Sequence, residues 1–395
     1  MLALWLTLAA ATPGDTAAPA AAQSAPAVTV HRQPTLPVVA LRLSLLADDP
    51  PGLAGAGHLI QHLHLGAMEE QAARVGGRVQ ALRTSDALVY TVTGPATELD
   101  FLAGVLRAAL RAPRAEGSQL LVALNTLGEE RAAERERAPS YVRASLRSRI
   151  FPGDLPAAGT AASARRLESA SLEAAWDRMY SPDRISVVAV GNVGVADVSR
   201  ALRGLPAGSG AAPGEALPDS VAPLAADTPQ ATQHWLGWAA PAGGDDPAAL
   251  SVAARILQGR LRRAMPNSAV EVEHWWTHHG HALAIVVATP GARAATARRT
   301  LGGALAAALA AVDEETVRTA AAGVRRDLLF YARTPERMAE VLGAFADRGD
   351  DPEAASGFFA ALDGVTEAAV RRVLEDVAAR EGFRVEVAPQ KLVPN

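Results

Sequence analysis

Hydrophobic and polar positions follow strand-like and helix-like patterns in two successive rounds along the chain. The first round opens with short apolar runs at residues 28–32 and 38–46, which we interpret as β-strands. Further strands are predicted over residues 78–82, 87–93 and 185–190. Helices are predicted over residues 53–74, 98–111, 118–149, 171–180 and 195–202. The 118–149 segment reads as one long, charged helix that bends near Pro139.

The same order of elements begins again after residue 230. Strands are predicted over residues 232–239, 270–278, 282–289 and 384–387. Helices are predicted over residues 247–257, 292–312 and 314–346, with two shorter helices behind them. A sheet with long helices, followed by another sheet with long helices, predicts an α+β fold of two homologous sheet-plus-helices domains.

The boundaries of these domains follow from changes in composition. Residues 204–230 are rich in Gly and Pro and break the pattern, which predicts a linker between domains at 28–203 and 231–395. Residues 1–27 hold a short apolar run and an Ala/Pro-rich stretch, as in a signal peptide with a flexible leader. We therefore expect an exported, periplasmic protein, or one associated with a membrane through the leader; a cytoplasmic protein with an Ala-rich tail is the alternative. No run of about 20 apolar residues predicts a transmembrane segment.

Composition removes several classes of function. The chain of 395 residues has 38 Lys and Arg against 42 Asp and Glu, a net charge of −4, so nothing favours binding to nucleic acid. It has no cysteine, which excludes disulfides, thiolate metal sites and cysteine nucleophiles. Lys391 is the only lysine and a poor candidate for Schiff-base chemistry. Histidines and carboxylates remain as the candidate chemistry.

Two groups of histidines stand out. His58 and His62 are four residues apart in a predicted helix, so both imidazoles project from one face, as two nitrogen ligands of one divalent ion would. Chance is the alternative, because the chain has nine histidines. In the second group, a strand over 270–278 would place His274 and His278 on one face, and His279 and His281 would likewise share a face. A second metal site is the alternative, but no family motif fixes these histidines, so we interpret this group as an ordinary β-hairpin.

The segment Gly57-His58-Leu59-Ile60-Gln61-His62-Leu63 is similar to the inverted zinc motif H-x-x-E-H. That motif belongs to the pitrilysin/insulinase (M16) zinc metallopeptidases. Residues 31–62 resemble the opening strands, acidic loop and zinc helix of that family, residues 75–93 its Gly-Gly two-strand segment, and residues 180–193 its Tyr-x-Pro strand. The resemblance covers about residues 28–395. It implies the M16, or LuxS–MPP-like metallohydrolase, architecture and the binding of peptide or unfolded polypeptide.

The resemblance also implies a ligand set for one Zn²⁺ per chain. The third ligand of the family is a glutamate on a later, long helix. Glu130-Arg131, with Pro139 and Tyr141 downstream, resembles that segment, so the implied ligands are His58, His62 and Glu130. Glu129 and Glu134 remain alternatives to Glu130 in this glutamate-rich region.

Two departures from the family concern catalysis. Gln61 stands where the family has its general-base glutamate, and a carboxamide has no usable pKa. A positioned acid or base contributes about 10²–10⁴-fold to a rate. The family also places an Arg and then a Tyr near the scissile bond; Arg260 or Arg263 would supply the arginine, and we assign Arg263, but no tyrosine follows in residues 264–276.

These departures favour a catalytically impaired M16-like protein, a pseudoenzyme with a retained zinc site. It would bind peptide, or pair with an active M16 homologue in a heterodimer. The alternative is an active zinc-dependent endopeptidase with an altered base that depends on a partner subunit for the missing groups. A third hypothesis is an unrelated α+β binding protein whose histidine pair is a coincidence.

Overall fold

The computed structural model describes residues 27–114, 116–152, 156–205, 231–244, 246–348 and 354–389. The expected leader at 1–27 lies outside these ranges except for Ala27, and so does all of the expected linker beyond residue 205. The domain boundaries therefore stay predictions. Among the described residues, no helix is both long and apolar enough to span a bilayer.

In the described residues, the first half of the chain builds a five-stranded sheet with the strand order β1-β5-β2-β4-β3. β1 pairs with β5 in parallel, and the other pairs are antiparallel. The strands are β1 (Ala27–Arg32), β2 (Val38–Leu46), β3 (Arg78–Arg83), β4 (Ala87–Pro95) and β5 (Ile185–Gly191). The helices are α1 (Ala56–Ala73), α2 (Leu99–Arg107), α3 (Gly117–Glu136), α4 (Ala138–Ile150), α5 (Ala161–Ala164), α6 (Ser169–Met179) and α7 (Val195–Ala201).

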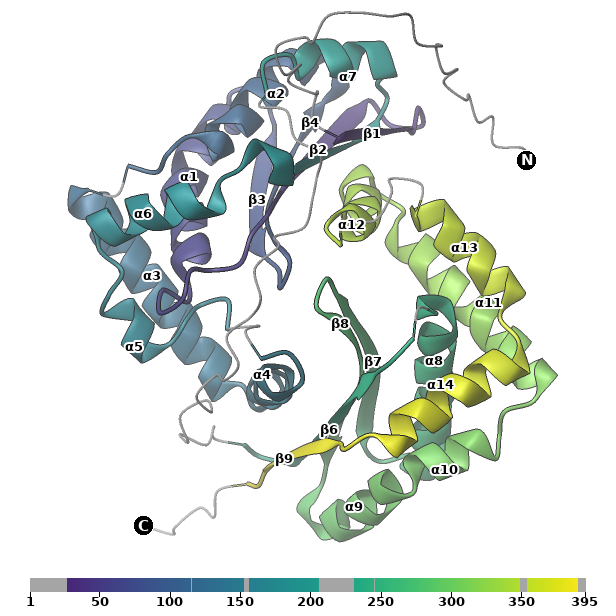
Figure 1. The fold of residues 1–395 in the computed structure, drawn as a ribbon. Helices are drawn as coiled ribbons and strands as arrows, with labels where there is room; N and C mark the ends of the chain where they lie inside the picture. The colour runs from purple at the N-terminus through teal and green to yellow at the C-terminus, as the bar shows by residue number, and fades with distance from the viewer. Residues whose placement is uncertain are drawn as a thin grey trace, which may run out of the picture.

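The second half repeats this plan with an antiparallel sheet of four described strands in the order β7-β8-β6-β9. The strands are β6 (His234–Ala242), β7 (Ala269–Thr277), β8 (Gly280–Thr289) and β9 (Phe383–Val387). The helices are α8 (Pro247–Ala264), α9 (Ala294–Gly302), α10 (Ala304–Leu309), α11 (Glu314–Tyr331), α12 (Pro335–Ala346), α13 (Ala354–Gly364) and α14 (Glu367–Ala379). Single 3₁₀ turns lie at Ala96–Glu98, Ala108–Leu110, Pro182–Arg184 and Gly291–Arg293. The predicted α+β class with two sheet-plus-helices halves is confirmed (Figure 1).

Three helices that the sequence predicts as continuous are broken in the structure. Residues 118–149 form α3 and α4, separated at Arg137, whose φ of −82° and ψ of 107° are extended. Residues 292–312 divide at Gly303, and residues 314–346 divide before Pro335. Pro139 and Pro335 each lie in the first turn of the new helix, where a missing N–H costs nothing. These breaks matter because they free α4 and α12 to turn away from their neighbours.

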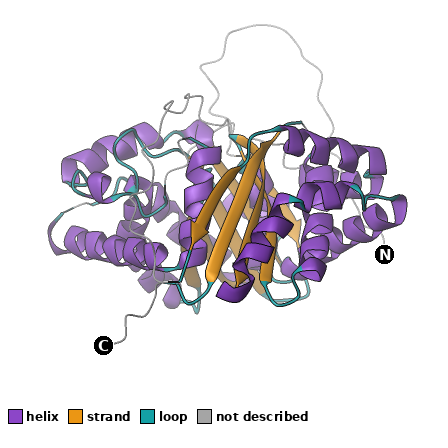
Figure 2. Cartoon of the chain, turned by 90° about the horizontal axis from the view of Figure 1, so that it is seen from below, coloured by secondary structure: helices purple, strands orange, loops and turns teal. Residues whose placement is uncertain are grey.

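Each sheet has one face covered by its own half and the other face covered by the opposite half. In β2, alternate side chains such as Val39 and Leu41 pack into the core made by helices of the first half. Ala40, on the other face of β2, packs with Val190 of β5 against Ala339 of α12, a helix of the second half. Figure 1 shows α12 beside the first sheet and α4 beside the second, and Figure 2 shows the strands gathered between outer helices.

α4 makes the reciprocal contact. Val142 and Leu146 of α4 are fully buried with residues of the second sheet, among them Ala239 and Ala284. Gly237 of β6 allows this close approach, because a Cβ there would lie 2.4 Å from Cγ1 of Val142. A larger residue at this position would push α4 away from the sheet.

A buried ion pair joins the two halves on the first sheet. Arg42 of β2 donates to Asp347 at the end of α12, and the two side chains are only 3% and 4% exposed. Gly343 of α12 lies directly against the guanidinium, which leaves no room for a side chain there. A charge buried this deeply is tolerated only while its partner is present.

We expect Asp347→Asn to lower the free energy of unfolding by about 3–5 kcal/mol, because it leaves the Arg42 charge buried without a counter-charge. Chemical denaturation measures this loss. Glu315→Gln, which removes the exposed Arg318–Glu315 pair, is the matched control and should change stability by less than about 1 kcal/mol. Equal effects of the two substitutions would show that Arg42 and Asp347 are not coupled across the halves.

Candidate metal centre

The helix that carries the two histidines, α1, begins at a carboxylate supplied by the loop before it. The Asp49 carboxylate accepts the N–H of Gly55 at 2.7 Å and the N–H of Gly57 at 2.9 Å. These donors belong to the first turn of α1, where N–H groups have no partner within the helix. Gly55 has a φ of 89°, in the left-handed region that favours glycine. The acidic loop thus sets where α1 starts and how its histidines are presented.

His58 and His62 lie together on α1 with Glu130 of α3 facing both. The Nε2 atoms of His58 and His62 are 3.2 and 3.3 Å from the same oxygen, Oε2 of Glu130. The two imidazole rings are stacked, with centroids 4.7 Å apart. The histidine side chains are 20% and 15% exposed and that of Glu130 is 42% exposed, so the group borders solvent on its carboxylate side.

The position of α3 selects Glu130 among the glutamates of this segment. Ala123 and Leu127 of α3 are buried in the first-half core, which fixes the rotation of the helix. Arg131 donates to the carbonyl of Ala158, in the loop that packs against the start of α1. Glu129 is exposed, and only Glu130 groups with the two histidines among the described residues.

The three side chains fit a zinc ion by donor type and by spacing. Tetrahedral zinc with ligands at about 2.0–2.1 Å separates those ligands by about 3.3–3.4 Å, close to the two observed separations from Glu130. Burial, and next the charge of His62, lowers the pKa of His58, which keeps its imidazole neutral as a metal ligand must be. His58, His62 and Glu130 could therefore hold one ion and leave a fourth position open.

Gln61 occupies a different environment from its two histidine neighbours. Its side chain is 1% exposed, and its amide Nε2 donates to the carbonyls of Leu82 in β3 and Val89 in β4 at 3.0 and 3.1 Å. Its Oε1 is buried without a hydrogen-bond partner. The side chain thus ties α1 to the β3–β4 hairpin. The sequence could not reveal this role, because the two carbonyl partners come from distant backbone.

Arg263, the predicted second-domain arginine, is not brought to this group. It lies exposed near the end of α8, a helix that packs on the face of the second sheet turned away from the first half (Figure 1). Within the described ranges, no hydrogen bond or ion pair joins it to His58, His62 or Glu130. Its catalytic assignment stays a prediction that the structure does not support.

His64, the third histidine of the helix, is part of the core. Its Nε2 donates to the carbonyl of Arg111 and its Nδ1 accepts the hydroxyl of Tyr90, each at 3.0 Å, which assigns the tautomer. Burial lowers the pKa of His64 to about 4. The residue is a neutral hydrogen-bonded connection between α1, β4 and the end of the α2 segment.

The expectation that His278 shares a strand face with His274 is wrong, because β7 ends at Thr277 and His278 and His279 form the turn. The strand partner of His274 is Leu283, and its side chain contacts His281 diagonally, with Nε2 2.9 Å from Nδ1 of His281. Burial, and next the charges of His281 and Arg348, lowers the pKa of His274 to about 3. The two half-buried rings are stacked, with centroids 5.2 Å apart. His278 and His279 instead face carboxylates of the first half. These carboxylates are far away in the sequence, so no local motif could have predicted the contact.

Comparison with solved structures identifies the fold. A structure described as a peptidase M16 inactive domain from Pseudomonas fluorescens matches with a TM-score of 0.75 and 15% identity over 92% of this chain and 96% of that one. A protease from Helicobacter pylori matches with a TM-score of 0.74 and 14% identity over 91% and 97% of the two chains. No protein-family model and no curated protein match the sequence. The chain therefore has the fold of the M16 peptidase-like proteins.

The surroundings of Gln61 give a prediction for Gln61→Glu. A carboxylate would face two carbonyl oxygens without a donor, so we expect a loss of roughly 1–3 kcal/mol in the free energy of unfolding at pH 7. Burial would raise the pKa of the new carboxyl in the folded state, so the loss should be small below about pH 4, where both states are protonated, and grow as pH rises. Denaturation of metal-free protein from pH 4 to 7 measures this.

Gln119→Glu is the matched control, because Gln119 is exposed in the first turn of α3. This change should alter stability by less than about 0.5 kcal/mol at either pH. A Gln61→Glu protein as stable as its parent at pH 7 would contradict the structural role of Gln61.

Proposed function

We propose that this chain is a degenerate member of the pitrilysin/insulinase family that keeps a zinc site and lacks efficient proteolysis. The observation that supports this most directly is the difference between the histidines of α1 and Gln61 on the same helix. His58 and His62 converge with Glu130, whereas Gln61 is a carboxamide already engaged by two backbone carbonyls. The arrangement of His58, His62 and Glu130 supports metal binding, and the absence of a glutamate at position 61 supports a loss of acid–base catalysis.

The chemistry open to this site follows from its residues. A zinc ion bound here would act as a Lewis acid toward a carbonyl or a water molecule. His58 and His62 would hold it from α1, while Glu130 would supply the negative charge from α3. Gln61 can donate or accept a hydrogen bond but cannot carry a proton from one group to another. The described part of the site therefore favours binding of a peptide over its cleavage.

The surface beside the site suits an extended peptide. β3 is an edge strand of the described sheet, so one side of its backbone pairs with no described strand and could accept an added one. Leu82 of β3 is 53% exposed, and its carbonyl accepts from Gln61 of the zinc helix. A peptide or unfolded polypeptide that pairs with β3 would lie next to α1. An active M16 homologue as a heterodimer partner is the related proposal, because one similar structure is described as an inactive domain.

The alternative function is an active zinc endopeptidase that uses another acid–base group, supplied by a partner subunit. The partial exposure of Glu130 leaves the site accessible to such a partner. The two proposals differ in what the isolated chain can do. They agree on zinc and on peptide as the bound species.

We expect His58→Ala to lower the zinc content of the purified chain by one ion, because two ligands rarely hold zinc alone. Metal analysis of the intact protein measures this. His31→Ala, which removes an exposed histidine of β1, is the control and should leave the zinc content unchanged.

The isolated chain should bind unstructured peptide but cleave it slowly. Typical enzymes turn over at about 10 s⁻¹, and loss of the acid–base group costs at least about 10²-fold, so we expect kcat below roughly 0.1 s⁻¹. Fluorescence polarisation and cleavage of a labelled unstructured peptide measure the two properties. Chelator-sensitive turnover near 10 s⁻¹ by the unmodified chain would establish the alternative function instead.

A further inference from the structure

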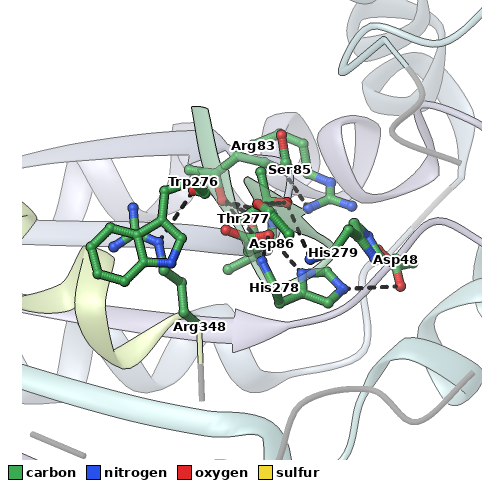
Figure 3. Close-up of polar contacts among 12 residues, drawn as sticks. Asp48, Arg83, Ser85, Asp86, Trp276, Thr277, His278, His279 and Arg348 are labelled. Atoms are coloured by element: carbon green, nitrogen blue, oxygen red, sulfur yellow. Dashed lines mark hydrogen bonds and ion pairs between the residues drawn. The ribbon is translucent and has the colours of Figure 1, made fainter. Parts of the chain in front are cut away.

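A second group of metal-ligating side chains lies where the two halves of the chain meet. Asp48 comes from the loop after β2 in the first half, and His278 and His279 form the turn between β7 and β8 in the second half. One ligand atom from each residue lies within 4.8 Å of the other two. Figure 3 shows the two histidines pointing toward Asp48 on one side and Asp86 on the other.

Asp86, in the β3–β4 turn, fixes the orientation of His278. Its Oδ1 accepts the backbone N–H of His278 at 3.0 Å and the Nδ1–H of the same residue at 2.6 Å. The opposite ring atom, Nε2, then points toward Asp48. A histidine whose Nδ1–H is held by a carboxylate and whose Nε2 is directed elsewhere has the arrangement found at metal sites.

The Nε2 atoms of His278 and His279 lack hydrogen-bond partners. Nε2 of His278 is 3.8 Å from Oδ2 of Asp48, and Nε2 of His279 is 3.6 Å from Oδ1 of the same residue. Both Nε2 atoms are buried without a hydrogen-bond partner, in side chains that are 8% and 10% exposed. Buried polar atoms normally find a partner, so two orphaned nitrogens facing one carboxylate indicate a missing ligand between them.

We propose that Asp48, His278 and His279 form a second divalent-cation site that fastens the two halves of the chain together. The donor set of two imidazole nitrogens and one carboxylate oxygen selects zinc or a similar borderline transition ion over Mg²⁺ or Ca²⁺. The three ligand atoms lie within 4.8 Å of one another, wider than the edge of a zinc tetrahedron at about 3.3–3.4 Å, so a bound ion would draw them inward.

Two carboxylates lie beside the buried ring nitrogens of this group. Asp48 is 3.8 Å from Nε2 of His278 and 3.6 Å from Nε2 of His279, and Asp86 is 2.6 Å from Nδ1 of His278. Such a cluster of negative charge stabilises a bound cation.

The site is also coupled to the zinc helix. Asp48 is adjacent to Asp49, whose carboxylate accepts the first N–H groups of α1. An ion on Asp48 would hold this loop against the β7–β8 turn, and so hold the start of α1 against the second half. The site is separate from His58, His62 and Glu130 and shares no ligand with them.

The test uses a variant without the first candidate site, so that ions bound at the second site can be counted alone. The full-length His58→Ala chain, stripped by a chelator, is titrated with Zn²⁺, and with Co²⁺ whose visible spectrum reports nitrogen and oxygen ligands. We expect one bound ion per chain and a higher unfolding temperature with the metal. Adding His279→Ala should abolish both effects, whereas adding His31→Ala as a control should preserve them.

Two further variants protect the test against misfolding. Asp48→Asn in the His58→Ala chain keeps the size of the side chain and should weaken binding at least tenfold. Asp86→Asn removes no ligand and should weaken it about 10–100-fold, as loss of a group that orients a ligating histidine does. If the His58→Ala chain binds no ion, or keeps its ion after loss of both His279 and Asp48, the second site is refuted. Neither result bears on the zinc content that depends on His58.

Discussion

An open β-sheet has two faces, and each half of this chain brings enough helices to cover only one. The other face of the first sheet is closed by α12 of the second half, and the other face of the second sheet by α4 of the first half. The Arg42–Asp347 pair and the small Gly237 and Gly343 let these helices approach closely. The positions of α1, the β3–β4 hairpin and the β7–β8 turn all follow from this reciprocal covering.

Two adjacent aspartates connect that scaffold to the candidate chemistry. Asp49 faces inward and accepts the first N–H groups of α1, while Asp48 faces His278 and His279 of the second half. Asp48 and Asp49 are consecutive but contact different elements, so one short segment serves both contacts. The α1 histidines His58 and His62 are therefore placed by the same loop that contacts the other half.

Local sequence patterns predicted much of this arrangement, because they depend on neighbours along the chain. The strands, the α1 histidine pair and the choice of Glu130 all follow from periodicity or from a resemblance in consecutive residues. A bend near Pro139 was predicted, but the full break at Arg137 and the break before Pro335 were not, because the tertiary packing of α4 and α12 decides them. The carbonyl partners of Gln61 and the link between His278 and Asp86, 192 residues apart, needed the structure, since no local signal encodes a contact across such a separation.

The reciprocal placement of α4 and α12 has a consequence for how such a chain could arise. A contact in which each unit lends the same kind of element to the other is the contact of a twofold-symmetric dimer. Here the two partners are halves of one polypeptide, and their sequences have diverged. The first half carries His58 and His62 on α1, whereas the corresponding helix of the second half, α8, has no histidine. A chain of half this length could build the same architecture as a homodimer, with two identical copies of the α1 histidine pair where this protein has one.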